Sequence, residues 1–201
     1  MTAPSPAESR LEPDRTLVHA SLTDPERFAE LYDRHASDIH RYIARRLGAE
    51  VADDLVAETF LAAFRRRDRF DPRRGEARPW LYGIASKLVA GHRRFEVRQY
   101  RLLARTAHDP VAEDHRDRAD DRVAAAAVTR QLAAALARLS KGDRDVLLLI
   151  AWESLTYEEV AQALDIPVGT VRSRLNRARK KVRKALGGVD PTDAGEELPR
   201  G

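Results

Sequence analysis

Hydrophobic residues recur at steps of three and four along several stretches of the chain, which is the period of an amphipathic helix. Three such stretches lie in the first half: residues 24–47, which stop before Gly48, residues 51–64, and residues 80–91, with Pro79 suited to a first helical turn. A Pro- and Gly-containing segment, residues 71–75, marks a turn before the third stretch. Because three helices of this length can enclose one core, the pattern predicts a helical N-terminal domain.

The helical period is lost between residues 93 and 121, where the charges are mixed, and it returns near Val123. We interpret the interruption as a linker with a continued helix at its start. Beyond it, one helix ends near Leu139, and Ser140 is a suitable N-cap for the next. The pattern therefore predicts a second helical domain.

A third and a fourth helix follow at once in this second domain. Thr156 with Glu159 three residues later has the spacing of a capping box at the start of a short helix, and residues 165–167 form a turn. An apolar stripe then restarts at helical spacing on a basic segment; it consists of Val168, Val171, Leu175, Ala178 and Val182. A short capped helix, a tight turn and a basic second helix are typical of a helix-turn-helix.

Charge supports a nucleic-acid partner for this segment. The net charge is only +4, but eight basic and no acidic side chains lie between Ile166 and Val189. The residues expected on the outer face of the second helix are Arg172, Ser173, Asn176, Arg177 and Lys180. Arg can hold guanine, Asn can hold adenine, and Ser or Lys can reach phosphate. We therefore favour DNA binding over a solvated basic face.

The second predicted helix of the first domain carries an acidic strip. Asp54 and Glu58 are four residues apart and share one helix face, with Asp53 and Leu61 close by. Such a mixed acidic and apolar face can dock a basic coiled coil. A solvated face with carboxylates at a helix start explains the residues equally well.

Composition sets the class. The chain has 201 residues, of which 34% are charged and 6% aromatic, and it is rich in Ala, Leu and Arg, so the fold class is predicted to be all-α. We expect two small helical domains joined by a flexible linker, the C-terminal one a helix-turn-helix domain. The predicted boundaries are a flexible leader at 1–20, domains at 21–97 and 123–187, a linker at 98–122, and a disordered tail at 188–201.

Several kinds of chemistry are not expected. There is no cysteine, the six histidines have no metal-ligand spacing, and no Gly-rich phosphate loop is present. We therefore predict no catalytic site, no metal and no cofactor. No stretch approaches the ~20 apolar residues of a membrane span, and no signal-peptide core follows Met1, so we expect a soluble cytoplasmic protein without membrane insertion.

Four motifs point to one family. The second domain contains LTYEEVA at 155–161 and PVGTVRSRL at 167–175, and the first contains DDLVAETF at 53–60 and PWLYGIA at 79–85. Both pairs resemble the extracytoplasmic-function sigma factors of bacterial RNA polymerase. The resemblance covers roughly residues 24–187.

The resemblance implies a transcription initiation factor that directs core RNA polymerase to promoter DNA. It implies that the acidic strip binds the clamp helices of the polymerase, and that the helix-turn-helix binds the upstream promoter element. The downstream element would be opened by the segment from Trp80 onward, with DNA contacts from Lys87, His92, Arg93 and Arg94. An inhibitory anti-sigma factor is also implied.

Two residues of the melting segment depart from the family pattern. Lys87 stands where the family commonly has Asn, and Gly91 stands where many relatives have an acidic residue. Base recognition in the downstream element therefore does not carry over from the family. For Trp80, we favour a place in the core over a DNA contact.

Two other hypotheses remain. A stand-alone helix-turn-helix regulator would need only the second domain and leaves the acidic strip and the melting segment without a purpose. A helical adaptor for an acidic protein or a membrane surface is disfavoured, because the basic helix lacks the large apolar patch that interfacial insertion needs.

Overall fold

The computed structural model describes residues 12–106 and 116–187. These residues form helices, turns and loops without any strand, which confirms the predicted all-α fold class. The chain divides into two compact units. Among the described residues, the first combines those up to Gly91 with residues 155–168, and the second combines those between 92 and 154 with those from Gly169 onward.

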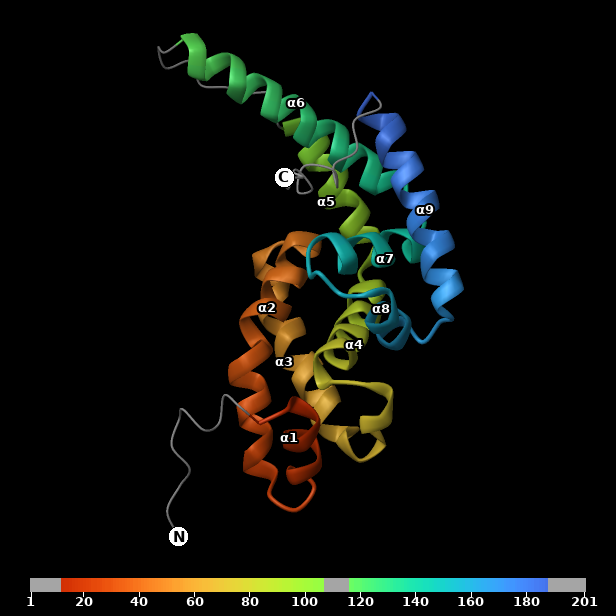
Figure 1. Cartoon of the computed structure of the whole chain (residues 1–201). Coiled ribbons are helices and arrows are strands. Elements are labelled where there is room, and N and C mark those ends of the chain that lie inside the picture. The colour runs from red at the N-terminus through yellow and green to blue at the C-terminus, as the bar shows by residue number, and fades with distance from the viewer. Residues whose placement is uncertain (1–11, 107–115, 188–201) are drawn as a thin grey trace, which may run out of the picture. The chain divides into compact units, whose positions relative to one another are not determined.

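The first unit is built on three long helices (Figure 1): α2, Ala29–Leu47, α3, Ala49–Arg65, and α4, Ala77–Gly91. Gly48 separates the first two with a φ of 89°, a backbone conformation that glycine adopts without a steric penalty. The fully buried side chains that join the three helices include Leu31, Ile39, Tyr42, Ile43, Leu47, Ala52, Ala63, Leu81 and Ala85. Except for Ala52, these residues belong to the apolar stripes that the sequence pattern predicts.

A short helix precedes these three. Residues Asp14–Ala20 form α1, and its Leu17 and Val18 are buried, although they lie within the predicted flexible leader. Because prolines and charged residues surround this apolar pair, the sequence shows no helical period there.

A carboxylate of α1 is held by charged neighbours. Burial alone would raise the pKa of Asp14, but the hydrogen bond and charge of His35, with those of Arg34, outweigh it and lower the pKa.

Helix α8, Tyr157–Leu164, also belongs to the first unit and packs against α4 (Figure 1). The approach is close at Gly83, where a Cβ atom would lie 2.3 Å from the carbonyl oxygen of Ala163. Only glycine fits here without moving the backbone. The side chain of Gln162 donates a hydrogen bond of 3.4 Å to the carbonyl oxygen of Glu76 at the same contact.

The second unit contains α5, Arg93–Thr106, α6, Arg116–Arg138, α7, Lys141–Ala151, and most of α9, Val168–Ala185. Helices α5 and α6 lie side by side (Figure 1). The predicted linker at 98–122 falls on the end of α5, the start of α6, and residues 107–115 between them, which lie outside the described residues. The predicted tail at 188–201 lies outside them too, so the domain boundaries stay predictions.

A buried ion pair joins α5 to α7. An Nη atom of Arg144 lies 2.6 Å from a carboxylate oxygen of Glu96, and both side chains are at most 1% exposed. The same guanidinium donates hydrogen bonds to the carbonyl oxygens of Leu136 and Leu139. Burial of a charge is costly unless it is paired and hydrogen-bonded, so this network fixes the start of α5 against α7.

Within the described ranges, no helix has the length and apolar character needed to cross a membrane.

The contact at Gly83 predicts that Gly83→Ala will destabilise the first unit by about 1–3 kcal/mol, because the new methyl group meets backbone. Urea unfolding followed by Trp80 fluorescence in a Trp152→Phe background measures this. Gly91→Ala is the matched control, since a Cβ there meets nothing within 4 Å. Equal stability of the two variants would contradict the close approach.

The buried ion pair predicts that Glu96→Leu alone will destabilise the second unit by about 3–5 kcal/mol, because Arg144 keeps an uncompensated charge. Adding Arg144→Met should recover part of the loss. Urea unfolding followed by Trp152 fluorescence in a Trp80→Phe background reports on this unit alone. Strictly additive losses would show that the two residues do not act as a pair.

Candidate polymerase and nucleic-acid interfaces

The four residues predicted to bind polymerase lie on the exposed side of α3. Asp53, Asp54, Glu58 and Leu61, which we call the acidic strip, are all exposed, and Leu61 keeps 47% of its surface. The opposite side of α3 is buried through Ala52, Leu55, Val56, Thr59, Phe60 and Ala63. The helical period therefore places the acidic strip outward because the apolar stripe is held inward.

Two neighbours of the acidic strip were not predicted. The Nε2 atom of His40 lies 3.0 Å from a carboxylate oxygen of Asp53, a contact for which the sequence holds no local signal. Glu58 and Leu61 also line a hollow of about 400 Å³ whose other walls include Ile84 and Lys87 of α4. The acidic strip thus borders an apolar groove between α3 and α4.

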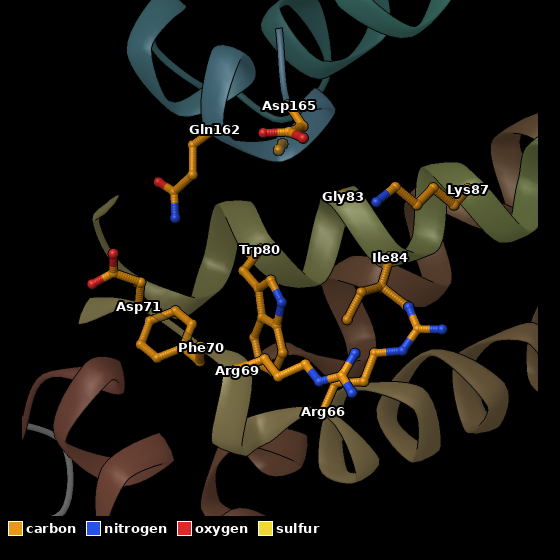
Figure 2. Close-up of a pocket in the computed structure, with 11 residues that line it drawn as sticks. Arg66, Arg69, Phe70, Asp71, Trp80, Gly83, Ile84, Lys87, Gln162 and Asp165 are labelled. Atoms are coloured by element: carbon orange, nitrogen blue, oxygen red, sulfur yellow. The ribbon is translucent and has the colours of Figure 1, made fainter. Parts of the chain in front are cut away.

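A second hollow of the first unit, of about 210 Å³, lies beside α4 (Figure 2). Phe70 and Trp80 stand next to one another in it, with ring centroids 5.2 Å apart. Figure 2 shows Gln162 and Asp165 across the hollow from these rings. Its full lining is Arg66, Arg69, Phe70, Asp71, Trp80, Gly83, Ile84, Lys87, Gln162, Ala163 and Asp165, and we call it the aromatic hollow.

The aromatic hollow changes the interpretation of two kinds of residue. Trp80, for which we favoured a place in the core, is only partly buried and lines the hollow. Lys87, whose DNA contact stays a prediction, is exposed and lines the hollow, and Arg66 and Arg69 are further cations of its lining that were not predicted. A run of arginines after a helix carries no signal for which of them will face a hollow.

The other predicted downstream contacts belong to the second unit. His92, Arg93 and Arg94 are exposed at the start of the second unit, where α5 begins, whereas Lys87 belongs to the first unit. Their exposure is compatible with DNA contact, and their roles stay a prediction.

The helix-turn-helix has the predicted local geometry. The amide of Glu159 donates to Thr156 Oγ1 at 3.2 Å, and the amide of Thr156 donates to Glu159 Oε2 at 2.8 Å, which confirms the capping box. After α8, Asp165 adopts the left-handed conformation with φ 52°, and the amide of Ile166 donates to the carbonyl of Ala161 at 3.0 Å. This turn ends α8 and lets α9 begin three residues later.

Helix α9 separates an apolar from a basic side. Four residues of the predicted stripe, Val171, Leu175, Ala178 and Val182, are buried, and the fifth, Val168 at the start of the helix, is partly buried. The predicted DNA contacts are all exposed: Arg172, Ser173, Asn176, Arg177 and Lys180. One of them, Arg177, also forms an ion pair with Asp143 of α7.

The part of the chain described by the structure contains no group of three or more His, Asp or Glu side chains placed to hold a metal.

Two families match the chain at the places where these surfaces lie. Residues 31–99 match Sigma-70 region 2, and residues 129–182 match Sigma-70, region 4. The ECF RNA polymerase sigma factor SigC of Mycobacterium tuberculosis is 34% identical over 158 residues, which cover 78% of this chain and 80% of that protein. The chain belongs to the extracytoplasmic-function sigma factors.

Other relatives of this sigma factor support the same family. The RNA polymerase sigma factor CnrH of Cupriavidus metallidurans is 32% identical over 182 residues, covering 86% of this chain and 94% of that one. A solved structure of CnrH in complex with the cytosolic domain of CnrY matches with a TM-score of 0.62 and 26% identity, over 87% of this chain and 97% of that chain. As a sigma factor, the chain is a transcription initiation factor that binds core RNA polymerase and promoter DNA.

Proposed function

We propose that this sigma factor divides promoter recognition between three surfaces: the acidic strip for polymerase, the aromatic hollow for the downstream element, and the outer side of α9 for the upstream element. The observation that carries the proposal is that one chain exposes an acidic face on α3 and a basic face on α9. A stand-alone helix-turn-helix regulator would use only the second of these, and it is not favoured.

The acidic strip suits the clamp helices of the polymerase. Asp54, Glu58 and Leu61 follow each other at steps of four and three along one side of α3 and offer two carboxylates and an exposed apolar side chain. Such a side can lie along a basic helix, with charge steering the encounter and the apolar contact stabilising it.

The aromatic hollow suits an unstacked base. Opening a duplex without ATP requires that a base leaves the stack at a cost of a few kcal/mol, which contacts in a pocket must recover. Trp80 and Phe70 offer aromatic faces for stacking, and Arg66, Arg69 and Lys87 supply charge for the phosphates beside it. We assign His92, Arg93 and Arg94 to the same strand.

The outer side of α9 suits the major groove of the upstream element. Arg172 and Arg177 supply guanidinium groups, Asn176 an amide, and Ser173 and Lys180 reach for phosphate. Mixed inventories of this kind combine base recognition with backbone anchoring.

The remaining parts of the proposal concern the cell. We assign catalysis to the polymerase, since the relatives are initiation factors and the surfaces found here bind rather than react. We propose that the protein acts in the cytoplasm, because its partner is RNA polymerase. CnrH is described in complex with CnrY, and we propose that an anti-sigma factor likewise controls this chain.

Run-off transcription tests the proposal as a whole. Core polymerase incubated with this chain should initiate at discrete sites on fragmented genomic DNA of the source organism, and core polymerase alone should not. Sequencing the transcripts would then reveal two shared elements upstream of the start sites. Failure to initiate, with intact core polymerase and folded protein, would overturn the proposal.

Reversing charge on the acidic strip tests docking. Asp54→Lys with Glu58→Lys should lower affinity for core polymerase at least about tenfold, because carboxylates facing a basic partner become repulsive lysines. Asp33→Lys with Asp38→Lys makes the same change of charge on α2 and serves as the control. Fluorescence anisotropy of the labelled chain with core polymerase measures both, and equal loss in the two variants would argue against a specific docking face.

Abasic sites test the aromatic hollow. In holoenzyme binding to the single-stranded non-template downstream element, one abasic position should weaken binding by about tenfold, the value of one stacked base. With Trp80→Leu, that position should no longer matter, because the stacking ring is gone. Trp152→Leu, which alters the other tryptophan, should keep the wild-type profile. An unchanged abasic profile in Trp80→Leu would exclude Trp80 as the base platform.

A further inference from the structure

The first turn of α7 lies against the basic helix α9 within the second unit. A carboxylate oxygen of Asp143, Oδ1, accepts hydrogen bonds from Nε and an Nη atom of Arg177 at 3.3 and 3.1 Å. Its other oxygen lies 3.6 Å from Nζ of Lys181. The guanidinium of Arg174 covers the preceding residue, since a Cβ at Gly142 would lie 2.8 Å from one of its nitrogens. Three cations of α9 thus gather at one helix start.

This gathering needs a compensating charge. The N-terminus of a helix carries a partial positive charge, which repels cations. Asp143 supplies the only carboxylate that the described residues bring to Arg177 and Lys181, and its side chain is 4% exposed while theirs are 55% and 51% exposed. Burial raises its pKa, but the bonds from Ser140 and Arg177 and the charges of Arg177 and Lys181 outweigh this and lower the pKa. The carboxylate is therefore ionised at neutral pH.

The position of Asp143 is set by the helix start itself. Ser140 is the N-cap of α7, and its hydroxyl accepts a hydrogen bond from the amide of Asp143 at 3.2 Å. Asp143 therefore stands on a rigid element. A flexible arginine that is tied to such a group loses rotamer freedom before DNA arrives, so less is lost on binding.

The pair engages only one edge of the guanidinium. The carboxylate of Asp143 accepts hydrogen bonds from Nε of Arg177 and from the Nη atom on the same edge. The other edge, formed by the two Nη atoms, points away from that carboxylate. That second edge carries two parallel N–H bonds, which match the O6 and N7 acceptors of guanine. An arginine held along one edge is thereby aimed for bidentate recognition with the other.

We propose that Asp143 is a positioning residue for base recognition: it fixes Arg177 so that the free edge of the guanidinium recognises guanine in the upstream element. The inference rests on the proposed function of α9. A carboxylate near DNA also repels phosphate and weakens non-specific binding. Asp143 thus raises specificity in two ways, by aiming Arg177 and by lowering affinity for other sequences.

The positioning role of Asp143 and a purely electrostatic role predict different effects of Asp143→Asn on DNA binding. If Asp143 only screened Arg177, Asp143→Asn would tighten binding to every sequence. If Asp143 positions Arg177, the same change should lower preference for guanine at one base pair, whatever happens to total affinity. Preference at single positions therefore separates the two.

The experiment uses holoenzyme and a pool of promoter fragments randomised across the upstream element, with bound fragments sequenced. Wild type should prefer guanine at one position, and Arg177→Ala should abolish that preference. Asp143→Asn should reduce it about fivefold or more at the same position, consistent with partial loss of a bidentate contact. The double variant should be no worse than Arg177→Ala alone, because both act through one group.

Two further variants keep the test decisive. Arg177→Lys retains the charge beside Asp143 but lacks the second edge of the guanidinium. This variant should lose the guanine preference and largely keep its total affinity for DNA. Because the side chain of Arg177 is 55% exposed, we expect the substitution to leave the fold intact. Glu158→Gln removes one exposed carboxylate of the helix-turn-helix and should leave the preferences unchanged.

Three results would overturn the inference: unchanged preferences in Asp143→Asn with an unchanged melting temperature, effects of Asp143→Asn and Arg177→Ala at different positions, or an Arg177→Ala variant that weakens all sequences equally. Each leaves the sigma-factor proposal standing, because wild-type holoenzyme still selects promoters. If wild type selects none, the proposed function itself fails.

Discussion

The surfaces of this sigma factor depend on helices that each bury one side. In α3, the stripe that includes Leu55 and Phe60 is held in the core, and this alone determines that Asp54 and Glu58 face outward. In α9, the stripe through Leu175 has the same effect on the basic side. A surface on a packed helix is more precisely placed than one on a loop. Recognition here therefore rests on packing, and a rotated helix would abolish it even with every charge retained.

Charges serve two purposes in this chain, and burial separates them. The pair of Arg144 and Glu96 is almost completely buried, is satisfied by carbonyl oxygens as well, and fixes α5 to α7. Arg177 and Lys181 of α9 stay more than half exposed, so they keep the capacity to bind a polyanion. Asp143 connects the two purposes, because it is buried like a structural group but contacts side chains proposed to bind DNA.

Much of the fold could be predicted from the sequence because it is local. Helices α2, α3 and α4 follow from apolar spacing, and the capping box at Thr156 follows from two residues three apart, whereas most of α5 and the start of α6 lie in the predicted linker. Other features arise from contacts between distant residues. Three of them are the burial of α1, the aromatic hollow with Trp80, and the pairing of Arg177 with Asp143. The segments that they join are separated by many residues, more than 80 in the case of the hollow, so no rule of local spacing predicts them. The charged faces of α3 and α9 were found because each lies within one helix.

Site-specific photo-crosslinking in a promoter complex tests the central claim most directly. Three variants of the chain, with a crosslinking probe at position 58, 87 or 172, report on the three proposed surfaces in the same promoter complex. The account predicts that position 58 crosslinks to polymerase, and that position 172 crosslinks to DNA upstream of the site reached from position 87. Crosslinks from 172 to protein alone, or from 87 and 172 to the same stretch of DNA, would contradict it.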